Sequence, residues 1–476
     1  MENIMTTLKD IQTRMQAAIH DRKVFEQAKS YAFEYMDTVN TRSVFPEPEA
    51  IDALKSFTED LPEKPFNGAE LLKMLHNYGS PATVVQTGGR YFGFVNGSIL
   101  PPVLAAKWLA DTWDQNPALY VISPVTSHLE MLCEKWLVQL FGLPEGTAAG
   151  FVSGTSTATL CGLAAGRDAL LQGLGWSSHQ NGLFGAPELQ VIVGEQAHAT
   201  VFKALSFLGL GRERVVRVAV DKQGCMRPDA LPQLNSSTLL ILQAGNVNSG
   251  GFDPLLPLCT AAREAGAWVH VDGAFGLWAA CSKETDHLTN GIELADSWSV
   301  DGHKTLNAPY DNGIILCKNR AALVNAMRAS GSYISYSDKR DGMLYTPEMS
   351  RRARGIELWA TLMTLGREGI DALISGLCHH ARKCAELLTA YSFRITNRID
   401  FNQILVACDR PELTRATLKY LQQSGTCWCG SSEWQGELVI RVSVCSWATT
   451  ETDIELTVDA FVAARTKAIN ELNNNL

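Results

Sequence analysis

TLLILQAGNVNSGGFDPLLPLCTAAREAGAWVHVDG, residues 238–273, holds two apolar runs joined by a helix-like segment. The runs TLLILQAG and AWVHVDG are apolar at successive positions, so neither face of an expected strand is polar. Between them, PLCTAAREAGA has the composition of a helix. Strands that are apolar on both faces and alternate with helices are typical of a parallel sheet covered on both sides. This stretch therefore predicts an α/β fold.

The same alternation extends on both sides of this stretch. Residues 148–171 (AAGFVSGTSTATLCGLAAGRDALL) are expected to form a strand, a turn and a helix. Short apolar runs bounded by turns predict further strands at 189–195, 214–220 and 296–302, and SSHQNG (177–182) is expected to be a surface loop. A large α/β domain follows from this pattern.

The two ends of the chain have a different pattern. The first 85 residues read as helices, for example VFEQAKSYAFEY and the proline-started FPEPEAIDALKSF. After residue 350, long helical segments mix with short strands. We therefore expect a helical N-terminal segment at 1–85 that packs against a partner subunit, a large α/β domain at 86–350 and a small α+β domain at 351–476.

Composition restricts the possible partners and compartment. The chain has 476 residues, 46% of them hydrophobic, and a formal charge of −9 without any basic cluster, which argues against a nucleic-acid partner. No apolar run approaches the ~18–20 residues that span a bilayer, and MENIMTTLKDIQTRMQ lacks the apolar core of a signal peptide. Among twelve scattered cysteines only Cys427 and Cys429 are close, so reduced thiols, no metal site and a cytoplasmic location are expected.

Polar residues just after the apolar runs are the candidates for a binding site, because ligands bind beyond the carboxyl ends of parallel strands. Gly154, Thr155 and Ser156 lie between an expected strand and helix, where N–H groups and hydroxyls can hold a phosphate. The turn is neither a Walker loop nor a G-x-G-x-x-G fingerprint. His198 opens another helix after a strand. Taken singly, these residues can equally be helix caps.

Two charged residues also follow strands. Asp272 ends AWVHVD and is followed by small residues that leave room for a flat group, including Ala274. A buried carboxylate is costly unless it meets a cation or hydrogen-bond donors. Lys304 lies 32 residues later in SVDGHKTLNAPYDNG, again at a strand end. A single lysine is usually a solvated charge, but a lysine, an aspartate, a histidine and a phosphate turn together fit pyridoxal phosphate.

That cofactor would use all four features. A lysine amine forms a Schiff base with its aldehyde, and an aspartate keeps the pyridine nitrogen protonated so that the ring accepts electrons. The histidine can stack on one face of the ring, and Ala274 permits close approach to the other.

The motifs HVDGAFG, SVDGHKTLNAPYDNG, GEQAHATVFKAL and VIRVSVCSWATTETDIE resemble the group II pyridoxal-phosphate amino-acid decarboxylases, within the aspartate-aminotransferase superfamily. The resemblance runs from GGRYFGF (88–94) to about residue 465. It implies a fold type I enzyme with a mostly parallel seven-stranded sheet in the large domain. It further implies that Lys304 binds the cofactor and Asp272 the pyridinium, that His198 stacks on the ring, and that the phosphate end is contacted by Thr155, Ser156 and His303, with Asp301 close by. Asn246 stands where many relatives have threonine.

The resemblance also concerns the segment RASGSYISYSDKRDGMLYTPEMS, 328–350, which is rich in Gly, Ser, Asp and Tyr and is expected to be a mobile lid. In the family a lid tyrosine reaches the partner's active site and protonates Cα after CO₂ leaves. Tyr333 matches that tyrosine by its spacing from the lysine, and Tyr336 is the second choice. This implies an obligate homodimer that forms an amine. The Pro-Tyr-Asp-Asn-Gly turn after Lys304 is expected to lead toward the lid.

Several alternatives stay open. A pyridoxal-phosphate aminotransferase or another lyase that cleaves a Cα bond would use the same lysine and aspartate, and a non-catalytic member would keep the fold. Arg441 is a candidate for binding a substrate carboxylate in either enzyme class. The arginines at 351, 352 and 354 are expected to form a solvated or interface cluster. In GGRYFGFVNGS the side chains of Tyr91, Phe92 and Phe94 favour an aromatic substrate, whereas those of Asn96 and Ser98 suit a polar or acidic one.

Overall fold

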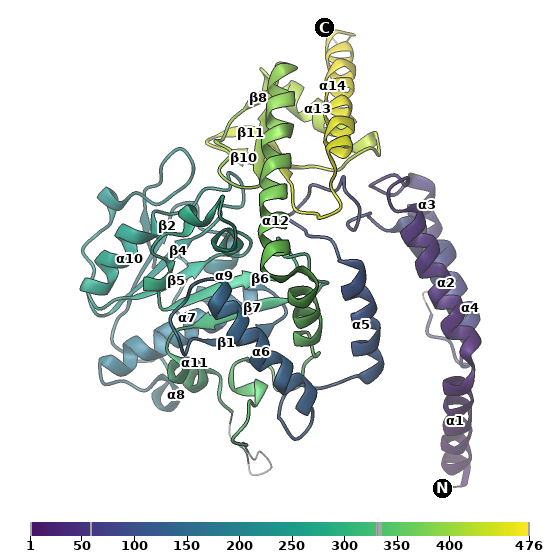
Figure 1. Cartoon of the computed structure of the whole chain (residues 1–476), viewed down its shortest axis with the longest axis horizontal. Coiled ribbons are helices and arrows are strands. Elements are labelled where there is room, and N and C mark those ends of the chain that lie inside the picture. The colour runs from purple at the N-terminus through teal and green to yellow at the C-terminus, as the bar shows by residue number, and fades with distance from the viewer. Residues whose placement is uncertain (1, 58–59, 330, 332–335, 475–476) are drawn as a thin grey trace.

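The computed structural model describes residues 2–57, 60–329, 331 and 336–474. Its centre is a seven-stranded sheet in the order β1-β7-β6-β5-β4-β2-β3 (Figure 1). The strands from β6 to β3 pair in parallel, and β7 is antiparallel to both of its neighbours. The strands are β1 (Ala148–Val152), β2 (Gln190–Gly194), β3 (Val216–Val218), β4 (Thr238–Gln243), β5 (Trp268–Asp272), β6 (Ser297–Asp301) and β7 (Gly313–Cys317). The expected α/β fold class is confirmed.

One expectation about the path of the chain is wrong. The turn after Lys304 does not lead toward the lid but into β7, which returns through the sheet between β6 and β1. The five residues of β7, GIILC, are all buried. This short apolar run supplies the antiparallel strand next to the edge strand β1.

Helices cover both faces of the sheet. One face packs against α7 (Thr155–Gly173), α9 (Ala199–Phe207) and α11 (Arg320–Met327). The opposite face packs against α6 (Pro124–Leu140), α10 (Leu255–Glu264) and the first part of α12 (Gly355–Ala390). Residues 177–182 are not a plain loop, because Ser178–Asn181 form the short helix α8.

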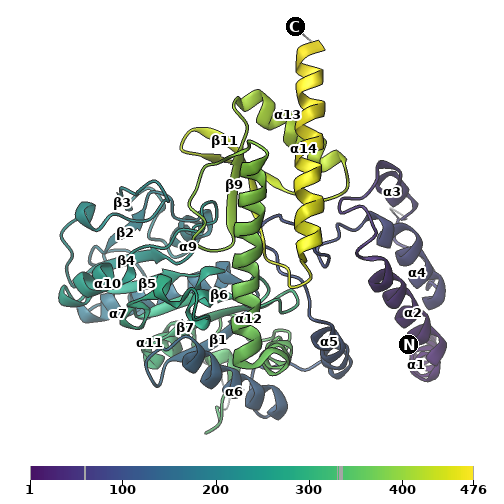
Figure 2. The ribbon, with the colours of Figure 1, turned by 45° about the horizontal axis from the view of Figure 1, so that its top comes forward.

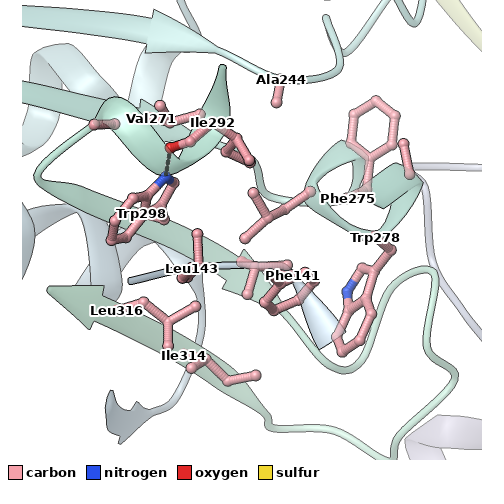
Figure 3. Packing of buried hydrophobic residues seen from close by; sticks show 14 of the residues in the cluster. Phe141, Leu143, Ala244, Val271, Phe275, Trp278, Ile292, Trp298, Ile314 and Leu316 are labelled. Carbon is pink, nitrogen blue, oxygen red and sulfur yellow. Dashed lines mark hydrogen bonds between the residues drawn. The ribbon is translucent and has the colours of Figure 1, made fainter. Parts of the chain in front are cut away.

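The core on the α6 side is rich in aromatic side chains (Figure 3). Trp298 is fully buried, and its indole N–H donates to the Ile292 carbonyl at 3.0 Å. The rings of Phe141 and Trp278 lie 4.9 Å apart between centroids. Large apolar surfaces whose single polar atom has a partner stabilise a core without leaving an unpaired donor.

The C-terminal part contains a second sheet, antiparallel, in the order β10-β11-β9-β8. Helix α12 leads into it and is interrupted at Gly366, where φ is 59°. The edge strand β10 was not expected from the sequence. The elements are β8 (Arg394–Ile395), β9 (Gln403–Ala407), α13 (Pro411–Gln423), β10 (Gly430–Trp434), β11 (Glu437–Ser443) and α14 (Glu451–Asn474).

The N-terminal helices stand beside this body rather than within it (Figures 1 and 2). They are α1 (Glu2–His20), α2 (Arg22–Thr38), α3 (Pro48–Asp52) and α4 (Gly68–Met74), followed by α5 (Pro101–Trp113). Several large apolar side chains on them are exposed, among them Ile19, Phe25 and Phe33. No helix in the described part of the chain is long and apolar enough to cross a membrane. The domain boundaries after residues 85 and 350 stay a prediction.

Candidate active site

Lys304 lies in the turn that follows β6. Its Nζ is 3.2 Å from Oδ2 of Asp301, the last residue of that strand, and its side chain is 20% exposed. Gly97 packs directly on this turn, since a Cβ there would lie 2.1 Å from the Lys304 carbonyl oxygen. Asn307 fastens the turn further by donating from Nδ2 to the carbonyl of Cys445 at 3.0 Å. The lysine therefore sits on rigid backbone with its amine beside a carboxylate.

Asp272 ends β5, the neighbour of β6, where it pairs in register with Ser299. It is 5% exposed, and among the described residues its carboxylate accepts one hydrogen bond, from the Ala274 N–H at 3.3 Å. Burial raises the pKa of Asp272, and the charges of His198 and Lys304 oppose this shift. A buried carboxylate with so few donors is suited to a cationic partner such as a protonated pyridine nitrogen.

His198 is the N-cap of α9, and its Nδ1 accepts from the Thr200 N–H at 3.3 Å. Burial lowers the pKa of His198; the carboxylate of Asp272 opposes the shift and Lys304 adds to it. His198 and Asp272 line one small cavity together with Gln196. The expected histidine and aspartate are thus brought together by two separate strand ends.

The expected phosphate turn lies close to Lys304. The Thr155 N–H donates to Asp301 Oδ1 at 2.7 Å, whereas the buried Thr155 Oγ1 has no hydrogen-bond partner in the described part of the chain. A Cβ at Gly154 would lie 3.4 Å from Cε1 of His303. Ser156 is exposed. A buried hydroxyl without a partner, next to a glycine and a histidine, fits a phosphate group.

Asp301 joins these residues. Besides Thr155 and Lys304, its carboxylate lies 3.6 Å from Nε2 of His303. His303 in turn accepts at Nδ1 from the Asn312 N–H at 3.1 Å, and its ring stacks on Tyr310 with 4.1 Å between centroids. Asp301 orients the lysine and the phosphate turn, which is a structural role within the site.

Asn246, predicted from the resemblance to be a cofactor-binding residue, makes hydrogen bonds at both ends of its side-chain amide. Its Oδ1 caps the following turn by accepting from the N–H groups of Asn248 and Ser249 at 2.9 and 3.2 Å. Its Nδ2 donates to the Gln196 carbonyl at 3.5 Å. Asn246 thus supports the segment that leads to His198, and its contact with the cofactor stays a prediction.

An aromatic group is linked to this site through Arg441, whose charge acts on the pKa of both Tyr91 and His198. The rings of Tyr91 and Phe94 stack on Trp428 at centroid distances of 5.2 and 5.6 Å. Trp428 was missed from the sequence because it comes from a segment more than 300 residues away; its signal is its position between the buried Cys427 and Cys429. Burial lowers the pKa of the neighbouring Arg441, and Tyr91 opposes this shift.

Three side chains of the GGRYFGFVNGS segment have structural roles. Phe92 is 1% exposed and belongs to the core of the C-terminal part. Asn96 accepts from the Tyr310 hydroxyl at 2.7 Å, and the Ser98 hydroxyl donates to the Thr87 carbonyl at 2.9 Å. These three side chains are thus engaged in structural contacts, and a substrate contact of Tyr91 or Phe94 stays a prediction.

The arginines at 351, 352 and 354 are predicted to be solvated or to lie at an interface. The prediction that they are solvated is wrong for Arg351 and Arg354. The Arg351 side chain is 1% exposed and its Nη1 lies 2.8 Å from Oε1 of Glu130. The Arg354 side chain is 6% exposed and pairs with Asp311 at 3.2 Å. Buried charges require partners, and carboxylates far away in the sequence provide them.

The lid tyrosine Tyr333 lies outside the described residues. Tyr336, the second choice, is described: its hydroxyl donates to the Ala329 carbonyl at 2.6 Å. Its ring packs against Ala118, Leu119 and Met343. This side chain is engaged within its own subunit.

Comparison with known proteins also indicates a pyridoxal-phosphate enzyme. Residues 55–407 match the family model described as the pyridoxal-dependent decarboxylase conserved domain, which is well over half of the chain. The chain belongs to this family. It is a pyridoxal-phosphate-dependent amino-acid decarboxylase, and its cofactor is pyridoxal 5'-phosphate.

Individual relatives are distant but cover most of the chain. An aromatic-L-amino-acid decarboxylase of Bacillus atrophaeus is 25% identical over 463 residues, covering 91% of this chain and 93% of the relative. An L-2,4-diaminobutyrate decarboxylase of Rhizobium meliloti is 26% identical, covering 77% and 74%. The structure of Oryza sativa TDC with PLP and tryptamine is similar with a TM-score of 0.86 at 21% identity, covering 94% of this chain and 97% of that one. This likeness confirms the expected fold.

Proposed function

We propose that this decarboxylase converts an aromatic L-amino acid to its amine and CO₂ at the site formed by Lys304, Asp272 and His198. The observation that carries the proposal is the placement of Asp272 at the end of β5 and of Lys304 in the turn after the adjacent parallel strand β6, close enough for the lysine charge to oppose the raised pKa of Asp272. When bound, pyridoxal phosphate supplies an electron sink for the bond that breaks at Cα. The chain's own residues decide which bond breaks and where the proton goes.

Each residue has a separate role. Lys304 holds the cofactor covalently through its amine, and Asp272 keeps the ring nitrogen protonated. His198 would stack on the cofactor ring, and burial lowers its pKa, which favours the neutral imidazole there. Because Asp301 already occupies the Thr155 N–H, the Thr155 hydroxyl is the group left for the phosphate, with Ser156 and His303 beside it.

The outcome of the reaction depends on orientation. Loss of CO₂ requires the Cα–carboxylate bond to stand perpendicular to the cofactor ring, because only then do its electrons enter the ring system. A proton must then reach Cα. We assign this step to Tyr333 of the partner subunit on its position in the sequence, so the active unit is a homodimer.

Exposed apolar side chains on α1 and α2 support such an association. We place the dimer in the cytoplasm.

The substrate preference rests on Trp428. Its stacking on Tyr91 and Phe94 forms an aromatic surface, and Arg441 acts on both Tyr91 and His198. Aromatic rings pack favourably on such surfaces. The names of relatives that act on aromatic amino acids agree with this preference. Arg441 could instead bind an acidic side chain, so an acidic amino acid is the alternative substrate.

The test is a panel of L-amino acids incubated with the purified holoenzyme. We expect CO₂ and amine in equal amounts, with the highest kcat/KM for an aromatic substrate. Keto acid without CO₂ would identify an aminotransferase and contradict the proposal. Preference for aspartate or glutamate would retain decarboxylation and transfer substrate selection to Arg441.

A further inference from the structure

Strand β1 lies at the edge of the seven-stranded sheet, and among the strands of the described residues it pairs with β7 alone. Its residues Ala149 and Phe151 direct backbone groups away from β7, toward the side where a further strand would lie in a larger sheet. Such unpaired backbone groups cost free energy when they are buried without partners. In this chain they have partners, and these are charged side chains.

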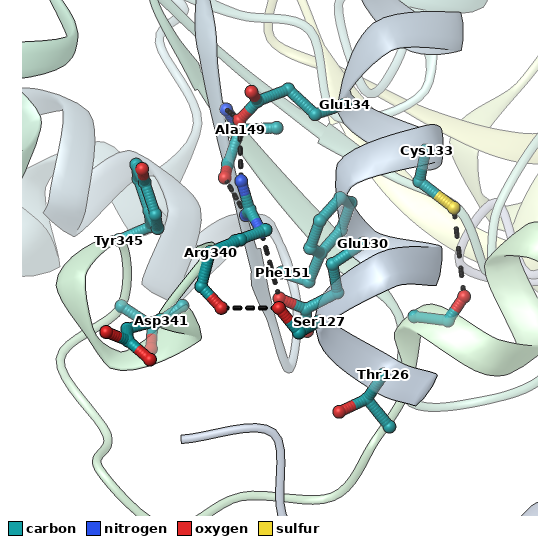
Figure 4. A network of polar contacts seen from close by, with 12 residues as sticks. Thr126, Ser127, Glu130, Cys133, Glu134, Ala149, Phe151, Arg340, Asp341 and Tyr345 are labelled. Atoms are coloured by element: carbon teal, nitrogen blue, oxygen red, sulfur yellow. Dashed lines mark hydrogen bonds and ion pairs between the residues drawn. The ribbon is translucent and has the colours of Figure 1, made fainter. Parts of the chain in front are cut away.

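Three side chains bind this open edge. Glu134 Oε2 accepts from the Ala149 N–H at 2.7 Å, and Arg340 Nη2 donates to the Ala149 carbonyl at 2.5 Å, as Figure 4 shows. Two residues further along the strand, Arg354 Nη1 donates to the Phe151 carbonyl at 3.3 Å. The Glu134 carboxylate thus replaces the carbonyl of a neighbouring strand, and the two guanidinium groups replace its N–H groups.

The group is itself held rigidly. The Arg340 side chain is 6% exposed, and its Nη1 lies 2.7 Å from Glu134 Oε2 while its Nε lies 3.3 Å from Glu130 Oε2. Its guanidinium lies over the Tyr345 ring at 4.3 Å from the centroid. A buried ion pair contributes little net stability but can specify one arrangement of its neighbours. Here the ion pair holds the backbone of β1 at Ala149 in one position.

The strand leads directly into the phosphate turn. β1 ends at Val152, and Thr155 begins α7 three residues later. The turn has almost no space to shift sideways, because a Cβ at Gly313 would lie 2.3 Å from the Gly154 Cα. A displacement of β1 along its own axis therefore moves Thr155 relative to Asp301 and His303.

We propose that Arg340, Glu134 and Arg354 are positioning residues that replace a missing strand at the edge of β1 and thereby hold the Gly154–Thr155 turn in place for the cofactor's phosphate. The inference rests on the proposed contact between Thr155 and that phosphate. It differs from a purely structural role in one respect: loss of the edge contacts selectively weakens recognition of the phosphate group.

The experiment compares binding of pyridoxal phosphate with binding of pyridoxal, which can react with the same lysine but has no phosphate. Arg340→Met in the full-length apoenzyme is expected to weaken pyridoxal phosphate about tenfold, equivalent to ~1.4 kcal/mol, and to change the Kd for pyridoxal less than twofold. Arg340→Lys keeps a charge beside Glu134 and should recover part of the affinity. An equal loss of affinity for both ligands would overturn the inference.

Two further variants separate this inference from its premises. Thr155→Val should lower the ratio of the two affinities by itself; if it does not, the proposed phosphate contact is wrong. If Thr155→Val lowers the ratio and the Arg340 variants do not, the positioning role is wrong. Leu421→Ala creates a cavity in the core of the C-terminal part, which destabilises the fold, and it should leave the ratio of the two affinities unchanged.

Folding of the variants is checked independently. Should Arg340→Met fail to fold, Glu134→Gln retains an oxygen for the Ala149 N–H and removes only the charge, and we expect a threefold fall in the same ratio. Hydrogen exchange of residues 148–155 in the apoenzyme should accelerate in both edge variants and not in Leu421→Ala. Unchanged exchange at β1 in the edge variants would contradict the proposal.

Discussion

The two ends of the cofactor site are built in different ways. At the centre of the sheet, Asp272 and Lys304 are placed by backbone pairing between β5, β6 and β7, with neighbours on both sides. At the edge, the Gly154–Thr155 turn follows β1, which has one neighbouring strand. Side chains from distant segments complete the backbone hydrogen bonds of β1. The centre is thus specified by local strand patterns, whereas the edge depends on long-range charged contacts. Substitutions at the two ends should therefore have distinguishable effects.

The largest effect is expected for Lys304→Ala. Without the amine that holds the cofactor covalently, CO₂ release should fall at least about a thousandfold. The measurement is single-turnover CO₂ release at saturating pyridoxal phosphate. Retention of more than a tenth of the wild-type rate would show that another group does this work.

Asp272→Asn tests the other residue at the centre. An amide cannot keep the pyridine nitrogen protonated, so we expect kcat to fall by roughly a hundredfold, the size of a typical proton-handling contribution. Since the phosphate turn is untouched, the Kd for pyridoxal phosphate should change by less than about threefold, which is under ~1 kcal/mol. A large loss of affinity for pyridoxal phosphate with unchanged kcat would contradict the assignment of catalysis to the centre and of cofactor binding to the edge.

Tyr333→Phe tests the assignment of the proton donor. We expect the amine yield to fall about tenfold, because the hydroxyl to which we assign proton delivery to Cα is lost. In air-saturated buffer, part of the product should become aldehyde, with dioxygen as the oxidant and ammonia and hydrogen peroxide as co-products. Amine and aldehyde are quantified together by chromatography. Tyr336→Phe is the matched control and should retain the amine yield, since the Tyr336 hydroxyl is bonded to Ala329. Loss of amine yield in Tyr336→Phe, with none in Tyr333→Phe, would assign the proton donor to Tyr336.

Trp428→Ala should act on substrate recognition alone. Loss of an aromatic contact worth about 1 kcal/mol is expected to raise KM for an aromatic substrate roughly fivefold while kcat stays within about twofold. Trp176→Ala, remote from the strand ends, is the control. An unchanged KM would remove Trp428 from the substrate site.

The last prediction concerns the pH dependence of folding stability and has no direct effect on catalysis. His270 is fully buried between Ser297 and Ser299, and burial lowers its pKa to about 3. The unfolded chain binds a proton near pH 6.5 and the folded chain does not, so this histidine's contribution to stability is complete above pH 6.5. It is lost as the pH falls toward 3, by up to ~1.4 kcal/mol per pH unit.

His270→Gln should accordingly flatten the dependence of the apoenzyme's melting temperature on pH between 5 and 6.5. His287→Gln, on an exposed side chain, is the control and should keep the wild-type slope. An unaltered slope in His270→Gln would mean that the buried imidazole takes up its proton in the folded state.

Much of the centre was predictable from the sequence, and little of the edge was. The runs that form β4, β5 and β6 are apolar on both faces, and the polar residues that end them are the catalytic candidates, so the pattern alone located Asp272 and Lys304. The strand β7 was missed because GIILC follows a charged turn, and β10 was missed because its residues are mostly partly exposed and polar. Trp428 and Arg340 reach the site or its support through contacts that span hundreds of residues, which no local pattern encodes.

The most direct test of the site is to reduce the holoenzyme with borohydride and to map the modified peptide by mass spectrometry. Reduction fixes the cofactor to the amine that holds it. We predict one equivalent per chain, attached to Lys304, in the wild type and in Asp272→Asn alike. Attachment to any other lysine, or no attachment, would contradict the assignment of Lys304 as the residue around which this active site is built.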